Sequence, residues 1–366
     1  MKQPAITRSL LQWYEVHRRN LPWRGSADPY RIWISEIMAQ QTQLERVVTY
    51  YQRWLKRFPD VTALAAADED VVLKLWEGLG YYSRARHILA AARKIMSRFG
   101  GEFPRQFAEI RSLPGIGDYT AGAIASMAFG LPVPAVDANV LRVFARLDNL
   151  DQPIRNAATR AAVTRRVRSL QPAERPGDFN EALMELGALV CTRNPACDLC
   201  PLQVHCEGFR TNVVADRPVK EPKPGASKIS MVSGVLPYGG KLLIQKRRLD
   251  NVWPGLWEFP GGVIEKGESP ETALVREFQE ELELAVEPET KIAVVRYSYT
   301  RYRVTMHAYY CRLAGDAVPL PVFKEALTGR FVSPGVLGDY AFPAGHRKLI
   351  DIMVDKAEFS RRLAQS

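Results

Sequence analysis

The sequence predicts a two-domain protein with an all-α N-terminal half and an α+β C-terminal half. Its 366 residues, of which 46% are hydrophobic, supply material for two cores. Apolar residues recur at helical spacing before residue 208, and strand-like alternation begins after residue 229. Residues 209–229 are rich in proline and lysine, which is typical of a linker. We therefore predict a helical domain over 1–208 and an α+β domain over 230–366.

Amphipathic patterns define the helices of the first half. An apolar stripe predicts a helix over most of the first twenty residues, with Ile6, Leu10, Trp13 and Tyr14 on one face. Asp28 followed by Pro29 is a helix start signal. Further helices are expected over about 30–58 with a break, 68–79, 83–99, 157–170 and 179–190.

The stretch 113–147 predicts two helices that follow a glycine-rich turn. Gly115 and Gly117 flank Ile116 just before an apolar helical run. Such a turn leaves backbone N–H groups available at a helix N-terminus, which suits a phosphate. An ordinary tight connection between helices explains the same glycines. Asp137 opens the second helix, either as a carboxylate for chemistry or as a plain N-cap.

Glu36 is a candidate acid or base because of its apolar neighbours. Trp33, Ile34, Ile37 and Met38 surround it in sequence. Loss of solvation raises the pKa of a carboxyl, which then exchanges a proton near neutral pH. The alternative is an acid near a helix start, where negative charge is favoured.

The segment GLGYYSRAR is a candidate contact with nucleic acid. Its glycines permit a tight turn that presents Tyr81 and Tyr82 beside Arg84 and Arg86. Aromatic rings among cations suit stacking on bases and pairing with phosphates. A core tyrosine pair with solvated arginines is the alternative.

The formal charge of +10 predicts an anionic partner, either nucleic acid or an acidic membrane surface. The N-terminus lacks the apolar core of a signal peptide, and no run of 18 apolar residues is present. We therefore expect a cytoplasmic protein with no membrane partner.

Four of the five cysteines lie within sixteen residues, which indicates a metal site rather than disulfides. They are Cys191, Cys197, Cys200 and Cys206. Zinc and an iron–sulfur cluster both fit, and spacing alone does not decide between them. Cys311, in a strand-like run, is expected to be a buried thiol.

The second half shows two hairpin patterns. The run MVSGVLPYGGKLLIQKRR predicts a hairpin that turns at Gly239-Gly240. Residues 291–315, rich in β-branched and aromatic side chains, predict a longer one.

Several long motifs resemble a known family. LPGIGDYTAGAI, VDANVLRV and the four cysteines resemble the helix-hairpin-helix base-excision glycosylase superfamily. SEIMAQQTQ, GLGYYSRAR and the C-terminal half narrow the resemblance to the MutY-type adenine DNA glycosylases. The resemblance implies removal of adenine opposite 8-oxoguanine or guanine in double-stranded DNA, with the helix-hairpin-helix at about 108–125. We expect a monomer.

The resemblance also implies catalytic roles. Glu36 matches the acid that protonates the leaving adenine, and Asp137 the carboxylate that stabilises the sugar cation or forms a transient adduct. Asn139 and Glu181 match positions near the sugar and the attacking water. Because Glu36 has apolar neighbours and Asp137 opens a helix, we expect their pKa values to be pushed apart.

Further positions match the family in binding or in reaction subtype. Arg19 and Arg24 match positions that line the adenine pocket, and Gln41 and Tyr81 match residues that wedge the DNA open. Tyr119 stands where strand-cutting relatives carry a Schiff-base lysine. Tyrosine cannot form a Schiff base, so we expect little or no AP lyase activity.

For the cysteines the resemblance implies a [4Fe-4S] cluster rather than zinc. Five residues separate Cys191 from Cys197, one fewer than the family pattern, so a tighter loop is expected. The cluster would order this loop, with Arg193 and Arg210, against DNA.

Residues 255–284 resemble a Nudix box and its preceding strand. The pattern is met by Gly262, Glu268, Arg276, Glu277, Glu280 and Glu281. Glu283 stands where glycine is usual. One interpretation is a lesion-recognition domain that the box helix merely supports. The other is retained Mg²⁺ binding by Glu277, Glu280 and Glu281, with hydrolysis of an oxidised nucleotide.

For recognition of 8-oxoguanine, the family often carries Phe-Ser-His in a hairpin. Tyr299-Thr300-Arg301 is the best match, and residues 297–299 are the alternative. Thr300 would bond to the lesion, Tyr299 would pack beside it, and Arg301 replaces the histidine. For these residues the alternative is an ordinary exposed hairpin. For the protein as a whole, a further alternative is a mismatch-binding protein without catalytic activity.

Overall fold

The structure is a computed structural model that describes residues 2–219, 225–315 and 320–364. It divides into two compact units. The first, here called the helical unit, combines Met1–Ala67 with His87–Pro222. The second, the mixed unit, combines Asp68–Arg86 with Lys223–Ser366. Residues 220–224 of the predicted linker lie outside the described residues, and the predicted domain boundaries stay a prediction.

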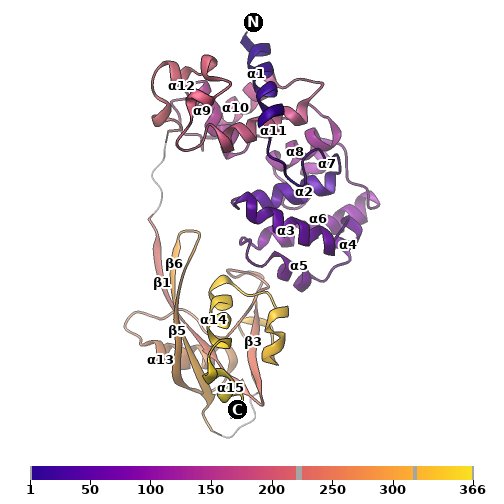
Figure 1. Cartoon of the computed structure of the whole chain (residues 1–366). Helices are drawn as coiled ribbons and strands as arrows, with labels where there is room; N and C mark the ends of the chain where they lie inside the picture. The colour runs from indigo at the N-terminus through magenta and orange to yellow at the C-terminus, as the bar shows by residue number, and fades with distance from the viewer. Residues whose placement is uncertain (1, 220–224, 316–319, 365–366) are drawn as a thin grey trace. The chain divides into compact units, whose positions relative to one another are not determined.

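Helices build the described part of the helical unit (Figure 1). They are α1 (Lys2–His17), α2 (Pro29–Ala39), α3 (Leu44–Arg57), α4 (Val61–Ala65), most of α6 (Ser83–Phe99), α7 (Phe107–Arg111), α8 (Asp118–Phe129), α9 (Ala138–Leu147), α10 (Ala157–Leu170), α11 (Pro176–Leu189) and α12 (Glu207–Arg210). Short 3₁₀ turns span Cys197–Leu199, Gln203–His205 and Val214–Asp216. Across the described residues, no helix has the length and apolar character that crossing a membrane requires.

The helix starts that position the site follow local sequence signals. Asp28 caps α2 by accepting a hydrogen bond from the Tyr30 N–H at 2.9 Å, which confirms the predicted start. The expected break in the 30–58 helix falls between α2 and α3, where Gln41 adopts a φ of 58°. Gly130 ends α8 in the left-handed conformation.

One core joins the first helix to three helices that lie far along the chain. Helices α1, α9, α10 and α11 contribute its buried residues. They include Ile6, Leu10, Trp13, Tyr14, Val140, Phe144, Val163, Val167, Phe179 and Leu183. The stripe predicted for the first helix is therefore confirmed. The same core buries the apolar face of α9 and so fixes the helix that begins just after Asp137.

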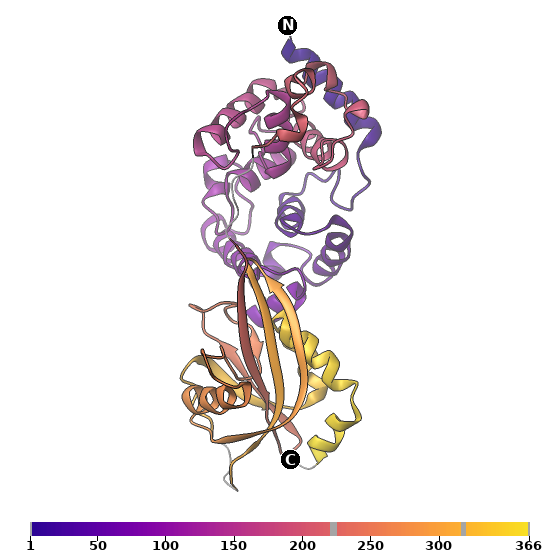
Figure 2. The same cartoon turned by 90° about the vertical axis from the view of Figure 1, so that its left-hand side faces the viewer.

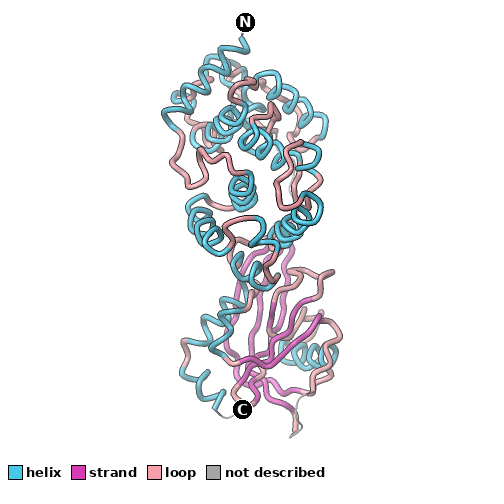
Figure 3. Tube along the Cα trace, turned by 90° about the vertical axis from the view of Figure 1, so that its right-hand side faces the viewer, coloured by secondary structure: helices cyan, strands magenta, loops and turns pink. Residues whose placement is uncertain are grey.

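The mixed unit contains every strand that the described residues form (Figure 3). Its elements are α5 (Glu69–Trp76), β1 (Ser227–Val235), β2 (Pro237–Tyr238), β3 (Lys241–Arg247), β4 (Trp257–Glu258), α13 (Pro270–Leu282), β5 (Val286–Tyr299), β6 (Tyr302–Leu313), β7 (Ala326–Val332), a 3₁₀ segment (Pro334–Asp339), α14 (Ala344–Val354) and α15 (Ala357–Ala364). One sheet has the order β1-β6-β5, and a second has β2-β3-β4 with β7 also paired to β3.

Both predicted hairpins form, one with a smaller partner than expected. β5 and β6 pair antiparallel around Thr300. Gly239 and Gly240 have φ values of 57° and 70°, as a two-residue hairpin turn requires, but only β2 pairs with β3 there. β1 runs parallel to β6 instead. Its second half, residues 231–235, is buried on both faces, and the strand bonds to residues 260–264 at its other edge, so it does not pair with β3 in a simple hairpin.

Two apolar cores lie on opposite sides of the strands. Met231 and Val235 of β1 join the core that contains α14, whereas Val232 joins the core of α13. Figure 2 shows these two helices on opposite sides of the strands. Cys311 is 1% exposed in the α13 core, which confirms the expected buried thiol.

Candidate active site

Glu36 lies half-buried near the end of α2. Its pKa is raised to about 7, chiefly by desolvation, with smaller contributions from the negative groups Glu181 and Asp137. The Tyr119 hydroxyl on α8 donates a hydrogen bond to its carboxylate, which acts in the opposite direction. The raised pKa expected from the apolar sequence neighbours is therefore confirmed. A carboxyl of this kind carries a proton near neutral pH.

Tyr119 of α8 is a neutral hydrogen-bond donor to Glu36 of α2. Burial, with the negative charges of Glu36 and Asp137, raises its pKa well above the ordinary value. Its hydroxyl also lies 3.7 Å from the Met184 sulfur on α11. The phenol therefore stays protonated and fixes the orientation of the Glu36 carboxyl.

Asp137 is the N-cap of α9. Its Oδ1 accepts from the Val140 N–H at 2.7 Å, and its Oδ2 accepts from the Asn139 amide at 2.8 Å. Burial nevertheless raises its pKa, against these hydrogen bonds. The helix start therefore does not lower the pKa of Asp137, because desolvation outweighs the capping bonds, and the separation of the two carboxyl pKa values stays a prediction.

Asn139 connects Asp137 to the cysteine loop. Its Oδ1 accepts from Arg142 Nη2 at 2.8 Å, and Arg142 Nε donates to the Cys191 carbonyl at 2.8 Å. A Cβ on Gly187 of α11 would lie 2.6 Å from the Asn139 Cβ. The glycine thus lets α11 approach α9 closely behind Asp137.

Arg24 joins two acids of α11. It pairs with Glu181 Oε1 and with Glu185 Oε1, each at 2.5 Å. Arg19 Nε donates to Glu185 Oε2 at 2.8 Å, and the Tyr14 hydroxyl donates to Glu181. The charges of Arg24 and Glu181 act on the pKa of Glu36, so we assign this cluster to the same site.

Sequence reasoning missed Glu185, which is completely buried. The available signal was its position four residues after Glu181, which puts both acids on one helix face.

The glycine turn before α8 has the geometry of a phosphate contact. Gly115 has a φ of 73°, and a Cβ there would lie 2.5 Å from His87 Cβ, so glycine is required. Gly117 is the N-cap of α8 and has no side chain to occupy the first N–H groups. Asp118 pairs with Arg111.

The four clustered cysteines line one cavity of about 30 Å³. Arg146 braces the segment after Cys191 by donating to the Thr192 and Arg193 carbonyls at 2.6 and 3.2 Å, so the short Cys191–Cys197 spacing closes without loss of a ligand. Within the described residues, no three His, Cys, Asp or Glu side chains gather closely enough for one metal ion. Four thiols around one cavity fit a soft-metal centre, and the choice between zinc and an iron–sulfur cluster stays a prediction.

Tyr81 and the predicted lesion hairpin meet in a second cavity, inside the mixed unit. Its volume is about 430 Å³, and Tyr81, Trp253, Tyr299 and Thr300 line it. The Tyr81 and Tyr299 ring centroids are 6.3 Å apart.

The structure places three other sequence-predicted residues differently from Tyr81. Tyr82 is a core residue whose hydroxyl donates to the Phe342 carbonyl at 3.2 Å. Arg301 is exposed and does not line the cavity, and Gln41 belongs to the helical unit. Sequence reasoning missed Trp253.

The carboxylates of the Nudix-like box are engaged by Arg276. Its guanidinium pairs with Glu268 at 2.9 Å, Glu277 at 3.0 Å and Glu280 at 2.9 Å. Glu281 accepts from Gln245 at 2.9 Å, and burial raises its pKa to about 7. Glu283, at the position usual for glycine, ends α13 with a φ of 55°. Arg276 supplies one positive charge against three carboxylates, and Mg²⁺ binding by Glu277, Glu280 and Glu281 stays a prediction.

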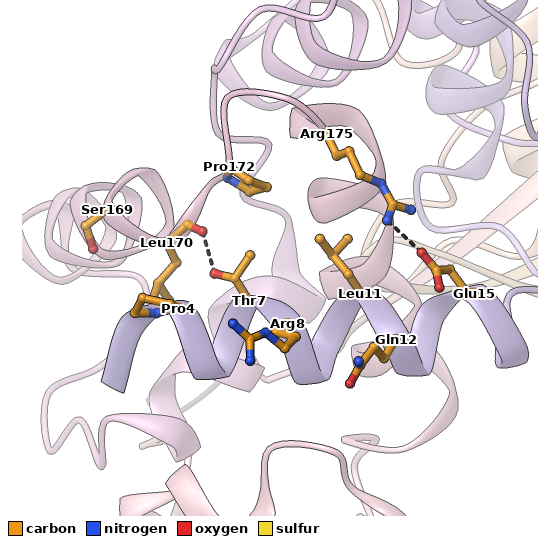
Figure 4. A pocket seen from close by; sticks show the side chains of 10 residues that line it. All are labelled: Pro4, Thr7, Arg8, Leu11, Gln12, Glu15, Ser169, Leu170, Pro172 and Arg175. Carbon is orange, nitrogen blue, oxygen red and sulfur yellow. Dashed lines mark hydrogen bonds and ion pairs between the residues drawn. The ribbon is translucent and has the colours of Figure 1, made fainter. Parts of the chain in front are cut away.

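A further cavity of about 510 Å³ lies between α1 and the segment before α11 (Figure 4). The Glu15–Arg175 ion pair at 2.6 Å and the bond from Thr7 to the Leu170 carbonyl cross it. None of the predicted site residues lines this cavity.

Comparison with known proteins matches both halves to families. Residues 34–169 match the HhH-GPD superfamily of base excision DNA repair proteins, and residues 232–351 match the NUDIX domain. A solved thermostable thymine-DNA glycosylase superposes with a TM-score of 0.53 at 29% identity, covering 57% of this chain and 97% of its own.

Relatives of known function align over most of the chain. The adenine DNA glycosylase of Arabidopsis thaliana is 32% identical, over 96% of this chain and 67% of its own length. That of Buchnera aphidicola subsp. Baizongia pistaciae is 38% identical, over 69% and 72% respectively. The human adenine DNA glycosylase is 33% identical over 75% and 61%.

Proposed function

Because the chain belongs to the adenine DNA glycosylase family, we propose that it hydrolyses the N-glycosidic bond of adenine opposite 8-oxoguanine or guanine in double-stranded DNA. The observation that carries this proposal is the half-buried Glu36, hydrogen-bonded by Tyr119 and electrostatically coupled to Asp137. Two carboxyls that share one site suit departure of a base from a sugar.

Protonation of the base is the first task. The adenine must leave the stack before its glycosidic bond is reachable. Glu36 then transfers its proton to a ring nitrogen of the extruded adenine, so the base departs as a neutral molecule. Tyr119 holds the carboxyl in position for this transfer.

Stabilisation of the sugar cation is the second task. Positive charge develops on the sugar as the bond to the base breaks. Asp137 faces this charge as a carboxylate that the Val140 N–H and the Asn139 amide hold in place. It stabilises the cation or forms a transient covalent adduct, and water then completes the hydrolysis.

The charged cluster around Arg24 supplies the rest of the pocket. Glu181, held by Arg24 and Tyr14, is the group that orients the attacking water. Arg19 and Arg24 line the space for the adenine. With Tyr119 in place of a lysine, no Schiff base forms, and strand cleavage is not part of the reaction.

DNA binding uses the glycine turn, the cysteine loop and the mixed unit. The N–H groups after Gly115 and Gly117 donate hydrogen bonds to a DNA phosphate. Gln41 and Tyr81 enter the gap that the extruded base leaves in the duplex. The four cysteines hold a [4Fe-4S] cluster, which keeps the loop with Arg193 ordered. Such thiols need a reducing compartment, which is consistent with a cytoplasmic location.

Base release tests the proposal directly. Duplexes with adenine opposite 8-oxoguanine, guanine or cytosine are incubated with the full chain and then treated with alkali to reveal abasic sites. We expect release opposite the first two, and a loss of about 100- to 10,000-fold in E36Q and in D137N. Strand breaks at a comparable rate without alkali would contradict the assignment of Tyr119. No base release by the wild-type chain, together with mismatch binding that E36Q and D137N leave unchanged, would favour a mismatch-binding protein.

The Nudix-like half serves lesion recognition in this proposal. Arg276 occupies three box carboxylates, so we expect no Mg²⁺-dependent release of pyrophosphate from 8-oxo-dGTP. Release that E280Q abolishes would establish the alternative hydrolase function.

A further inference from the structure

Backbone strain is concentrated around one cavity of the mixed unit. Among the described non-glycine residues, positive φ occurs at Gln41, Tyr81, Asn149, Asn212, Trp253, Glu283 and Thr300. Three of these, Tyr81 at 46°, Trp253 at 56° and Thr300 at 50°, line the same cavity of about 430 Å³. Aromatic and β-branched residues rarely adopt this conformation, and strain of this kind gathers at functional sites.

Trp253 is held in this conformation by a buried ion pair. Arg247 pairs with Glu258, which is 4% exposed, and donates from Nε to the Val252 carbonyl at 2.6 Å. The same guanidinium lies 5.8 Å from the Trp253 ring centroid. The backbone before the tryptophan and its ring are thus fixed from β3.

The Trp253 ring extends the aromatic surface of the predicted lesion hairpin. Its centroid lies 4.9 Å from that of Tyr299 and 6.1 Å from that of Tyr297. The Tyr81 ring also lies near Tyr299, with its centroid 6.3 Å away. Lys348, which is exposed, also lines the cavity and supplies a positive charge.

This combination has the chemistry of a base-binding cleft. Aromatic faces stack on a nucleobase, and a cation at the edge pairs with its phosphate. Thr300 adds a hydroxyl that can donate to or accept from the edge of the base.

We propose that Trp253 is a specificity-determining residue whose ring, with Tyr81 and Tyr299, walls a cleft for the oxidised purine opposite the adenine. The inference rests on the proposed function, which supplies 8-oxoguanine as the lesion. Stacking on the tryptophan fixes the plane of the purine whatever its identity, and so brings the edge of the base to Thr300, whose hydroxyl distinguishes 8-oxoguanine from guanine.

Two substitutions separate the ring from the backbone conformation. W253A removes the ring and keeps a residue strained at positive φ. W253G removes the ring and relieves the strain, because glycine adopts positive φ freely. V252A is the matched control, since Val252 is 47% exposed on the same loop and its side chain does not line the cavity.

The test compares adenine opposite 8-oxoguanine with adenine opposite guanine, using the full chain. Single-turnover base release is measured on both duplexes, and equilibrium binding on duplexes with a non-cleavable adenine analogue. We expect W253A and W253G to lower the preference for 8-oxoguanine about fivefold in affinity, because a purine that is no longer stacked loses one hydrogen bond between its edge and Thr300. V252A should keep the wild-type preference.

The two readouts keep this inference distinct from the proposed function. Equal losses on both duplexes, or an unchanged preference in W253A and W253G, would overturn the role of Trp253. A wild-type chain that releases no adenine would contradict the proposed function. The binding preference would then still decide the role of Trp253.

Discussion

At the scale of the residue, burial governs the candidate active site. Glu36 and Asp137 have very different hydrogen-bond partners, yet the pKa of each is raised, with desolvation as the largest cause. They differ in how the anion is supported: Asp137 accepts N–H groups at a helix start, whereas Glu36 accepts a phenol. The two carboxyls therefore differ in their hydrogen-bond partners, whereas desolvation shifts both of their pKa values in the same direction.

The Tyr119 hydrogen bond sets the pH dependence of base release. The acid acts in its protonated form, so the single-turnover rate should fall as pH rises through about 7, the pKa of Glu36. Because the bond from Tyr119 lowers that pKa, Y119F should move the inflection to higher pH. A pH profile from 5 to 9 checks both statements. An inflection that stays in place in Y119F would separate Tyr119 from the titration.

Glu36 should make the protein less stable at alkaline pH. Its folded-state pKa of about 7 exceeds the ordinary 4.5, so the folded state binds the extra proton and stability falls as pH rises between these values. The penalty is on the order of 3 kcal/mol above pH 7. E36Q should therefore raise the Tm by several degrees at pH 8 and by less at pH 5. A Tm increase equal at both pH values would contradict this account.

At the scale of the element, close helix contacts align the site. Gly187 of α11 lies against Asn139, next to the cap that positions Asp137. The α8 start depends on Gly115 in the same way, since His87 leaves no room for a side chain. These helices are therefore positioned by residues that contribute no functional group.

Adding one methyl group at Gly187 should disturb catalysis through this packing. G187A forces α9 and α11 apart near Asn139, and overpacking of this kind costs about 1–3 kcal/mol. We expect a lower Tm and a slower base release at saturating DNA. G338A is the control, because a Cβ at Gly338 meets nothing within 4 Å and should change neither quantity. A normal rate in G187A would show that the contact does not set the position of Asp137.

At the scale of the whole molecule, the two units carry different candidate functional groups. The helical unit carries the catalytic acids and the cysteine loop, and the mixed unit carries the aromatic cavity. The net charge of +10 favours contact between the chain and a polyanion.

DNA binding should weaken steeply with salt. Each phosphate neutralised by a lysine or arginine releases a counterion, which contributes about −0.9 to the slope of log K against log salt concentration. We expect K348Q to lower this slope by about one and to weaken both mispairs equally, because Lys348 faces a phosphate rather than a base. Anisotropy titrations between 50 and 200 mM salt measure it. A selective loss of 8-oxoguanine binding would assign Lys348 to the base instead.

The sequence by itself determined the parts that depend on neighbouring residues. The α2 start at Asp28, the Gly239-Gly240 turn, the long β5–β6 hairpin and the raised pKa of Glu36 all follow from local patterns. Tertiary structure decided the parts that depend on distant ones. It buried Asp137 enough to outweigh its cap, paired β1 with β6, and placed Trp253 in a cavity that no motif marked. The desolvation of Asp137 and the pairing of β1 with β6 arise from groups far apart in the chain, so spacing along the sequence does not encode them.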